Sequence, residues 1–204
     1  MSCIFVVARY NENIDWLNNV LNRSIVYNKG TPLHIQNEIM LENKGREGET
    51  YLRYIIDHYE SLPDVVVFIQ ARIEDYIGKN DVNYVLQMAN HAIQYGKSKP
   101  YMHSQTKTNM DWDKKWNYNN NQYYLQENYK NNKPIVFCDW FTTYIQDEYP
   151  DPIYIYRNGL FAIKKEFILK KSLDYYKQLI LEVNHHDNPA EGHFLERSWY
   201  YIFN

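Results

Sequence analysis

Cysteine is scarce in this chain of 204 residues: it has two, Cys3 and Cys138, far apart in sequence and each in an apolar run. Two buried thiols in a reducing compartment fit this usage better than a disulfide framework. Basic residues are not in excess either, because 22 Lys and Arg stand against 25 Asp and Glu and give a formal net charge of -3. Nucleic-acid binding through phosphates normally needs a basic excess, so we expect no nucleic-acid partner.

Long hydrophobic runs are also missing. The first apolar run, Cys3 to Ala8, has no basic residue before it and charged residues soon after it. It predicts a strand, and neither a signal peptide nor a membrane span. The joint over-use of Asn, Lys, Tyr and Ile is typical of AT-rich genomes, including those of some large viruses. Because neither a signal peptide nor a membrane span is predicted, we expect a cytoplasmic protein, in the host cytoplasm if the source is a virus.

Several catalytic signatures are absent. The glycine spacing matches neither a Rossmann dinucleotide site nor a P-loop, and no HExxH or paired-Cys zinc spacing occurs. No GxSxG elbow is present, and neither cysteine has a local nucleophile signature. Covalent hydrolase chemistry is therefore disfavoured.

The stretch from Asn43 to Asp75 organises the predicted fold. A polar loop with two glycines opens a helix over 49–59, and the apolar run Val65 to Ile69 follows after a Leu-Pro turn. Five consecutive apolar residues between polar boundaries suit a strand covered on both faces, as in a mainly parallel α/β sheet.

The rest of the chain fits a single domain over residues 1–204, which is long enough to bury a sizeable core. We expect a Rossmann-like mixed, mainly parallel sheet flanked by helices. The apolar patterns predict further strands at 3–8, 24–27, 33–40 and 153–156, helices at 14–21, 81–95, 167–183 and 189–203, an apolar run at 135–141, and a flexible loop or lid at about 104–133.

Polar residues at the predicted strand ends are the first site candidates, because open α/β sheets bind ligands there. Glu74 and Asp75 follow the strand at 65–69, where carboxylates can hold a divalent cation that bridges a diphosphate. A solvated acidic turn is the alternative.

Two further loops carry polar groups suited to a ligand. The loop from Asn43 to Gly48 offers backbone N–H groups, the Arg46 guanidinium and a helix N-terminus to an anion or a sugar hydroxyl. A turn that merely starts a helix is the alternative. Tyr10, Asn11 and Glu12 end the first strand, where they could hold a base and ribose. A helix cap would explain the Asn and Glu, but not the Tyr.

Near the C-terminus, Glu191, His193 and Glu196 lie close to a predicted helix start. One of the three could act as a general base or a metal ligand. Surface or structural charges, with Glu196 beside Arg197, are the alternative.

The ordered motifs resemble a known family. The chain is similar, over nearly its whole length, to a family catalogued as a domain of unknown function through the motifs VVARYNE, NKGREGETYLRYI, LPDVVVFIQ and EGHFLERSWYYIF. Members occur in bacteria, fungi, algae and large viruses. More distantly, the order resembles nucleotide-sugar glycosyltransferases of the GT-A fold. These have a first strand ending in a Tyr-Asn-Glu turn, an Asn-x-Gly loop that opens a helix, and a strand followed by a metal-binding Asp-x-Asp.

This resemblance implies roles for the candidate residues. It places Tyr10, Asn11 and Glu12 next to the nucleotide of the donor. It places Gly45, Arg46 and Glu47 next to the nucleotide or the sugar.

The resemblance also implies a metal and a base. It puts Asp75, with Glu74, at a Mn²⁺ or Mg²⁺ ion, His193 in the metal shell, and Glu191 or Glu196 as the base. The sequence QARIED departs from the pattern because it has no Asp-x-Asp, and Gln70 stands where the first acid is expected.

The leading prediction is a glycosyltransferase of the hexosyltransferase class that moves a sugar from a UDP- or GDP-sugar to a glycan or other hydroxyl acceptor. Trp112 and Trp116 in the long loop would offer flat faces to the acceptor. A positioned acid suggests inversion, with retention left open. The alternatives are a non-catalytic glycan- or protein-binding member of the same fold and a metal-dependent phosphoester hydrolase.

Overall fold

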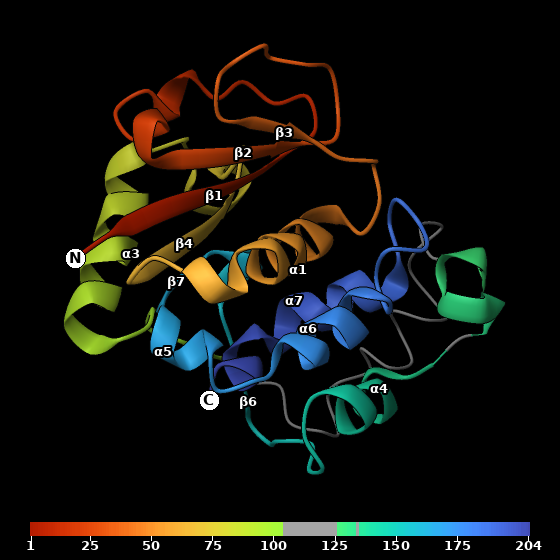
Figure 1. Ribbon diagram of the computed structural model, residues 1–204. Helices are drawn as coiled ribbons and strands as arrows, with labels where there is room; N and C mark the ends of the chain where they lie inside the picture. The colour runs from red at the N-terminus through yellow and green to blue at the C-terminus, as the bar shows by residue number, and fades with distance from the viewer. Residues whose placement is uncertain (104–125, 134) are drawn as a thin grey trace.

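The computed structural model describes residues 1–103, 126–133 and 135–204. A five-stranded sheet with the order β3-β2-β1-β4-β7 forms its centre (Figure 1). The first four strands are parallel and the last is antiparallel to β4. They are β1 (Cys3–Arg9), β2 (Ser24–Asn28), β3 (Glu38–Met40), β4 (Val65–Gln70) and β7 (Phe161–Lys164). The prediction of a mixed, mainly parallel sheet flanked by helices is confirmed.

Helices cover both faces of this sheet, and alternate residues of β1, β2, β4 and β7 pack into different cores. In β1, Phe5 and Val7 contact the core under α3 (Val82–Tyr95), whereas Val6 faces the opposite core. On that opposite face α1 (Arg46–His58) and α7 (Ala190–Ile202) pack against the sheet, and α6 (Leu173–Ile180) packs against α1 (Figure 1). Burial on both faces explains why the strands read as continuous apolar runs.

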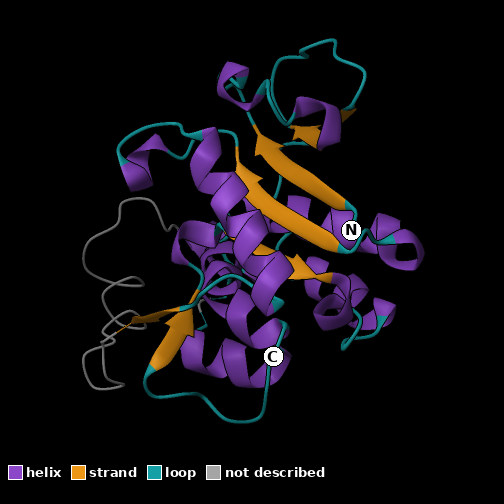
Figure 2. Cartoon of the chain, turned by 90° about the vertical axis from the view of Figure 1, so that its left-hand side faces the viewer, coloured by secondary structure: helices purple, strands orange, loops and turns teal. Residues whose placement is uncertain are grey.

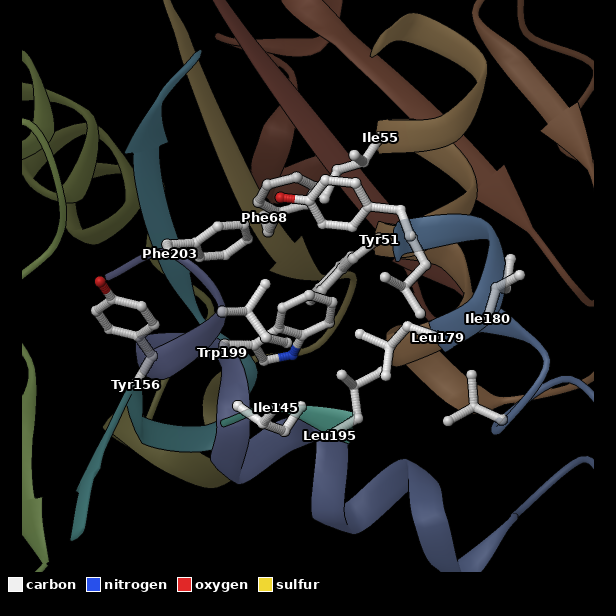
Figure 3. Packing of buried hydrophobic residues seen from close by; sticks show 14 of the residues in the cluster. Tyr51, Ile55, Phe68, Ile145, Tyr156, Leu179, Ile180, Leu195, Trp199 and Phe203 are labelled. Atoms are coloured by element: carbon white, nitrogen blue, oxygen red, sulfur yellow. The ribbon is translucent and has the colours of Figure 1, made fainter. Parts of the chain in front are cut away.

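Aromatic rings tie α1, α7 and the sheet together. The ring centroid of Tyr51 in α1 lies 4.9 Å from that of Phe68 in β4 and 5.9 Å from that of Trp199 in α7 (Figure 3). These rings are fully buried. The packing fixes where the first turn of α1 meets the first half of α7, and these two segments carry Arg46 and His193.

Smaller elements complete the described chain. A two-stranded antiparallel sheet stands apart from the central one (Figure 2, lower left). Its strands are β5 (Tyr101–His103) and β6 (Ile153–Ile155), and the short helices are α2 (Glu74–Ile77), α4 (Phe137–Tyr144) and α5 (Lys165–Ile168). Among the described helices, none is long and apolar enough to cross a membrane. The predicted loop at 104–133 lies mostly outside the described residues; its end forms 3₁₀ turns at Gln126–Asn128 and Lys130–Asn132.

The predicted helix at 14–21 is wrong. Short 3₁₀ turns occupy Asp15–Leu17 and Leu21–Arg23 instead. The buried residues Ile14, Leu17 and Val20 are three apart, which suits the three-residue repeat of a 3₁₀ helix better than the α-helical repeat.

Two other element predictions need correction, and one strand was not predicted. Only Glu38–Met40 of the predicted strand at 33–40 is extended in the sheet, because His34 takes a left-handed φ of 58°. The predicted helix at 167–183 is interrupted, and its second part starts where the Ser172 side chain caps α6 by accepting from Tyr175 N–H. Strand β7 was not predicted, since its pairing partner β4 lies far away in sequence.

Candidate functional site

A cleft of about 390 Å³ lies at the carboxyl ends of β1 and β4, beside the N-terminus of α1. Ligands bind at this position in open α/β sheets. Six predicted residues line it: Tyr10, Glu12, Arg46, Glu47, Gln70 and Asp75. The other lining residues are Ala8, Arg9, Lys29, Asn43, Thr50, Arg72 and Tyr76.

A buried lysine holds the start of α1 against the sheet. Gly45 and Arg46 have left-handed φ angles of 65° and 49°. The Lys29 ammonium, at the end of β2, donates to the Arg46 carbonyl at 2.6 Å and to the Lys44 carbonyl, and it pairs with Glu49 at 2.9 Å. These bonds secure a backbone conformation that is unfavourable for a non-glycine residue. Burial lowers the pKa of Lys29 despite the nearby Glu49.

Arg46 reaches from α1 to a histidine on α7. Its Nη1 lies 2.7 Å from Nε2 and 3.1 Å from Nδ1 of His193. The His193 carbonyl accepts from Arg197 Nη1 at 2.6 Å. Burial, followed by the Arg46 and Arg197 charges, holds the pKa of His193 well below its usual value. A neutral imidazole results, and it can accept a hydrogen bond from the Arg46 guanidinium.

The carboxyl groups of Glu47 and Glu196 lie close together beside Arg46 and His193. A Cβ placed on Gly159, whose φ is +66°, would lie 3.6 Å from Cγ of Glu196 and 3.8 Å from Cγ of Glu47. Glu47 is 3.6 Å from Arg46 Nε, and Glu196 is 3.9 Å from His193 Nδ1. Burial raises the pKa of Glu196, Arg197 opposes the rise, and the Glu47 charge adds to it. Only Glu47 of the pair lines the cleft.

Gln70 is fixed by two hydrogen bonds at the end of β4. It accepts from Tyr76 Oη at 3.2 Å and donates to the Asn158 carbonyl at 3.1 Å. The position where the glycosyltransferase pattern expects an acid therefore carries an oriented amide, and Tyr76 beside it forms one wall of the cleft.

The predicted metal residues do not come together. Arg72 donates to Asp75 through Nε at 3.0 Å and lies 3.9 Å from Glu74, and both carboxylates are about half exposed. His193 instead lies with Arg46 and Glu196. Among the described residues, no three His, Cys, Asp or Glu side chains form a group that could hold a metal ion. These donors do not fit the implied ion.

The remaining predicted residues lie elsewhere. Asn11 does not line the cleft; its Oδ1 accepts from Thr31 N–H at 2.9 Å, and Gly45 forms the turn before α1. Trp112 lies outside the described residues, as does Trp116. Glu191 does not line the cleft; it lines a second cavity bounded by α4 and the end of α6.

Seven cleft residues are not among the predicted site residues, although Asn43 begins the predicted loop: Ala8, Arg9, Lys29, Asn43, Thr50, Arg72 and Tyr76. Lys29 carried a usable signal, since it directly follows β2 and so lies at the same sheet edge as Arg9. Thr50 and Tyr76 carried none, because their positions depend on how α1 and α2 pack.

The chain belongs to a family described as a protein of unknown function (DUF3431), which matches residues 4–204. This confirms the predicted membership of a family of unknown function. No curated protein and no solved structure matches the chain.

Proposed function

We propose that this protein is a glycosyltransferase that moves a sugar from a nucleoside diphosphate donor, such as a UDP- or GDP-sugar, to a hydroxyl group of a glycan or similar acceptor. The observation that carries the proposal is the pairing of Arg46, at the N-terminus of α1, with the buried Glu47 carboxyl in the cleft, beside which the partly exposed Glu196 lies. The cleft thus offers a cation for a leaving diphosphate next to a base for a hydroxyl.

The donor's charge would be met at the start of α1. A helix N-terminus and a guanidinium both favour a phosphate group. Tyr10 at the rim is 50% exposed and offers a ring face to the nucleotide base. Glu12, which accepts from the Tyr10 N–H at 2.7 Å, would lie near the ribose together with Asn11.

The proton would go to Glu47. The acceptor oxygen forms a bond to the anomeric carbon, the bond from that carbon to the diphosphate breaks, and the acceptor proton passes to the Glu47 carboxylate. Arg46 neutralises the charge that develops on the leaving diphosphate. His193, which contacts Arg46, and Glu196, which lies beside Glu47 and His193, would hold these two side chains in position. Attack from the side opposite the diphosphate would give inversion.

Substitution of Glu47 tests this proposal. Nucleoside diphosphate release from a panel of UDP-, GDP- and dTDP-sugars with mixed oligosaccharide acceptors should fall about 100-fold or more in Glu47→Gln, as expected for loss of a general base. Donor affinity measured by calorimetry should change less than about twofold. Glu60→Gln, at an exposed position, is the matched control. Wild-type turnover in Glu47→Gln would contradict the role given to Glu47.

A non-catalytic glycan-binding protein is the second candidate, favoured by Gln70 in place of an acid and by the Arg72 contacts of Asp75. Binding of donor or glycan without turnover in the wild-type protein would support it. Release of inorganic phosphate or a free alcohol in place of a glycoside would instead indicate a phosphoester hydrolase.

A further inference from the structure

A strip of basic, aromatic and aliphatic side chains lies at the edge of the sheet opposite the cleft. Lys164, at the end of β7, pairs in register with Val65, the first residue of β4, whereas the cleft lies at the carboxyl end of β4. The strip extends from α5 to β6 at the end of the molecule that holds the C-terminus (Figure 1). Its residues, none of which lines the cleft, are Lys97, Met102, Tyr154, Phe167, Leu169, Lys170, Lys171 and Tyr200.

Contacts between ammonium groups and aromatic rings make this strip continuous. Lys97 Nζ lies 5.2 Å from the ring centroid of Phe167 and 5.2 Å from that of Tyr200. Lys170 Nζ lies 4.8 Å from the Phe167 ring centroid. The ring centroids of Tyr154 and Tyr200 are 5.6 Å apart. Segments that are distant in sequence therefore combine their lysines and rings into one surface.

The positive charge of the strip is not cancelled by ion pairs. In the part of the chain that the structure describes, Lys97, Lys170 and Lys171 pair with no Asp or Glu side chain. Lys97 Nζ donates to Asn204 Oδ1 and Lys170 Nζ to the Asn204 carbonyl at 3.0 Å, so each ammonium keeps further N–H donors. Burial, followed by the Lys170 charge, lowers the pKa of Lys97. Glu166 on α5 offsets one of these charges, and the surface stays positive.

Exposed apolar side chains lie among these charges. Leu169 directly precedes Lys170 and Lys171 and is 45% exposed. Met102 is 50% exposed, and its register partner Tyr154 is 36% exposed. Tyrosine and lysine suit the interface between lipid headgroups and acyl chains, because each has an apolar body and a polar end. An aliphatic side chain at the same surface can enter the acyl region.

We propose that this strip binds the surface of a membrane that contains anionic phospholipids, with its lysines on the headgroups and Leu169 inserted between them. A polyanion such as RNA would engage the lysines, but it would gain little from Leu169 and Met102, and the chain as a whole has a net charge of -3. A lipid surface uses both kinds of side chain. The strip and the cleft lie at opposite edges of the sheet, so this proposal stands independently of the transferase activity.

Cosedimentation of the full chain with lipid vesicles tests this surface. Vesicles of phosphatidylcholine and phosphatidylserine should bind the wild-type protein at least about tenfold more tightly than vesicles of phosphatidylcholine alone, because each lysine near an anionic surface contributes about fivefold in affinity. Lys170→Glu/Lys171→Glu should weaken binding to the anionic vesicles at least about 20-fold. The matched control is Lys44→Glu/Lys79→Glu, which changes the charge equally at two exposed lysines elsewhere and should alter the affinity less than about threefold.

The apolar part of the surface has its own variant. Leu169→Ser should weaken binding to the anionic vesicles about threefold or more, since membrane affinity scales with the apolar area that is buried. Leu181→Ser, at an exposed leucine just after α6, is its control and should leave the affinity unchanged. Added salt should weaken binding of the wild-type protein, because it screens exposed charges.

Three results would overturn the proposal: no binding to anionic vesicles, equal binding to both kinds of vesicle, or equal affinity in Lys170→Glu/Lys171→Glu and its control. Binding to RNA or heparin without binding to vesicles would overturn it too, and would indicate a polyanionic partner. Circular dichroism checks folding. If Leu169→Ser fails to fold, the lysine variants decide, because Lys170 is exposed and Lys171 half-buried. Absence of donor binding at the cleft would sink the transferase proposal and leave this result intact.

Discussion

At the scale of single residues, burial on α7 changes the acid–base chemistry of side chains that sequence alone presents as ordinary surface charges. Glu191 is nearly inaccessible to solvent, and burial raises the pKa of its carboxyl to about 7, although the Lys130 N–H bond opposes the rise. The same helix holds His193 in its neutral form. The protonation states near neutral pH therefore follow from packing.

Glu191→Gln should change how stability depends on pH. Because the folded-state pKa of about 7 lies above the ordinary 4.5, the folded protein retains a proton that the unfolded chain loses as pH rises. This contribution is present below pH 4.5 and disappears as pH rises to about 7. Gln mimics the neutral acid, so from pH 5 to pH 8 the variant should gain on the order of 3 kcal/mol relative to the wild type.

Urea unfolding of both proteins at pH 5 and pH 8 measures this gain. Glu60→Gln, with an exposed side chain, should keep a constant difference from the wild type at the two pH values. A constant difference for Glu191→Gln as well would show that the carboxyl titrates normally in the folded protein.

Predicted site residues lie at the cleft where a side chain's place follows from a strand end or a loop. Arg46 and Glu47 follow the glycine turn before α1 and line the cleft. Glu191 was grouped with His193 and Glu196 by sequence proximity, yet it lies in another cavity. The helical phase relative to the sheet decides this, and it depends on the Tyr51 and Trp199 packing that no local pattern shows.

At the scale of elements, the first turn of α1 depends on β2. Lys29 at the end of β2 is 5% exposed, and it joins the carbonyls of Lys44 and Arg46 to the Glu49 carboxylate. Removing one partner of a buried pair leaves the other charge desolvated, which is strongly unfavourable. Arg53 also contacts Glu49 at 3.2 Å and would offset part of that loss.

Lys29→Met should therefore lower the free energy of unfolding by on the order of 3 kcal/mol. Lys44→Met provides a matched control, because Lys44 pairs with Glu42 in solvent and an exposed pair contributes less than about 1 kcal/mol. Chemical denaturation of the two variants gives both values. Similar losses in the two proteins would mean that the Lys29 contacts do not hold α1 in place.

Elements with a strong local pattern were predicted from sequence. The buried strands β1 and β4 and the helices α1, α3 and α7 lie close to their expected ranges. Strand β7 was missed because its pairing with β4 is a contact between distant segments. The break before α6 was missed because a serine cap inside an apolar pattern is a weak signal beside the periodicity around it.

At the scale of the whole molecule, parallel strands bring the ends of β1, β2 and β4 to one edge of the sheet, and this is why a cleft lies at the edge where we expected a ligand from the sequence. The implied metal ligands did not assemble in the same way. Glu74 and Asp75 reach that edge, but Arg72 lies between them and occupies their carboxylates. The cation at this side of the cleft is a guanidinium of the chain itself.

The thermal stability of the wild-type protein with UDP-, GDP- and dTDP-sugars, each with and without Mn²⁺, separates the two sources of positive charge. A donor at about 100 times its Kd stabilises the folded state by roughly 2.7 kcal/mol, which raises the Tm by roughly 5–10 °C for a chain of this size. Because Arg46 and Arg72 already face the cleft, we expect this rise without Mn²⁺ for one nucleotide and no further rise when Mn²⁺ is added. Asp75→Asn should then leave the shift unchanged. A rise that requires Mn²⁺ and vanishes in Asp75→Asn would show instead that Arg72 gives up its carboxylates to a metal ion when the donor binds.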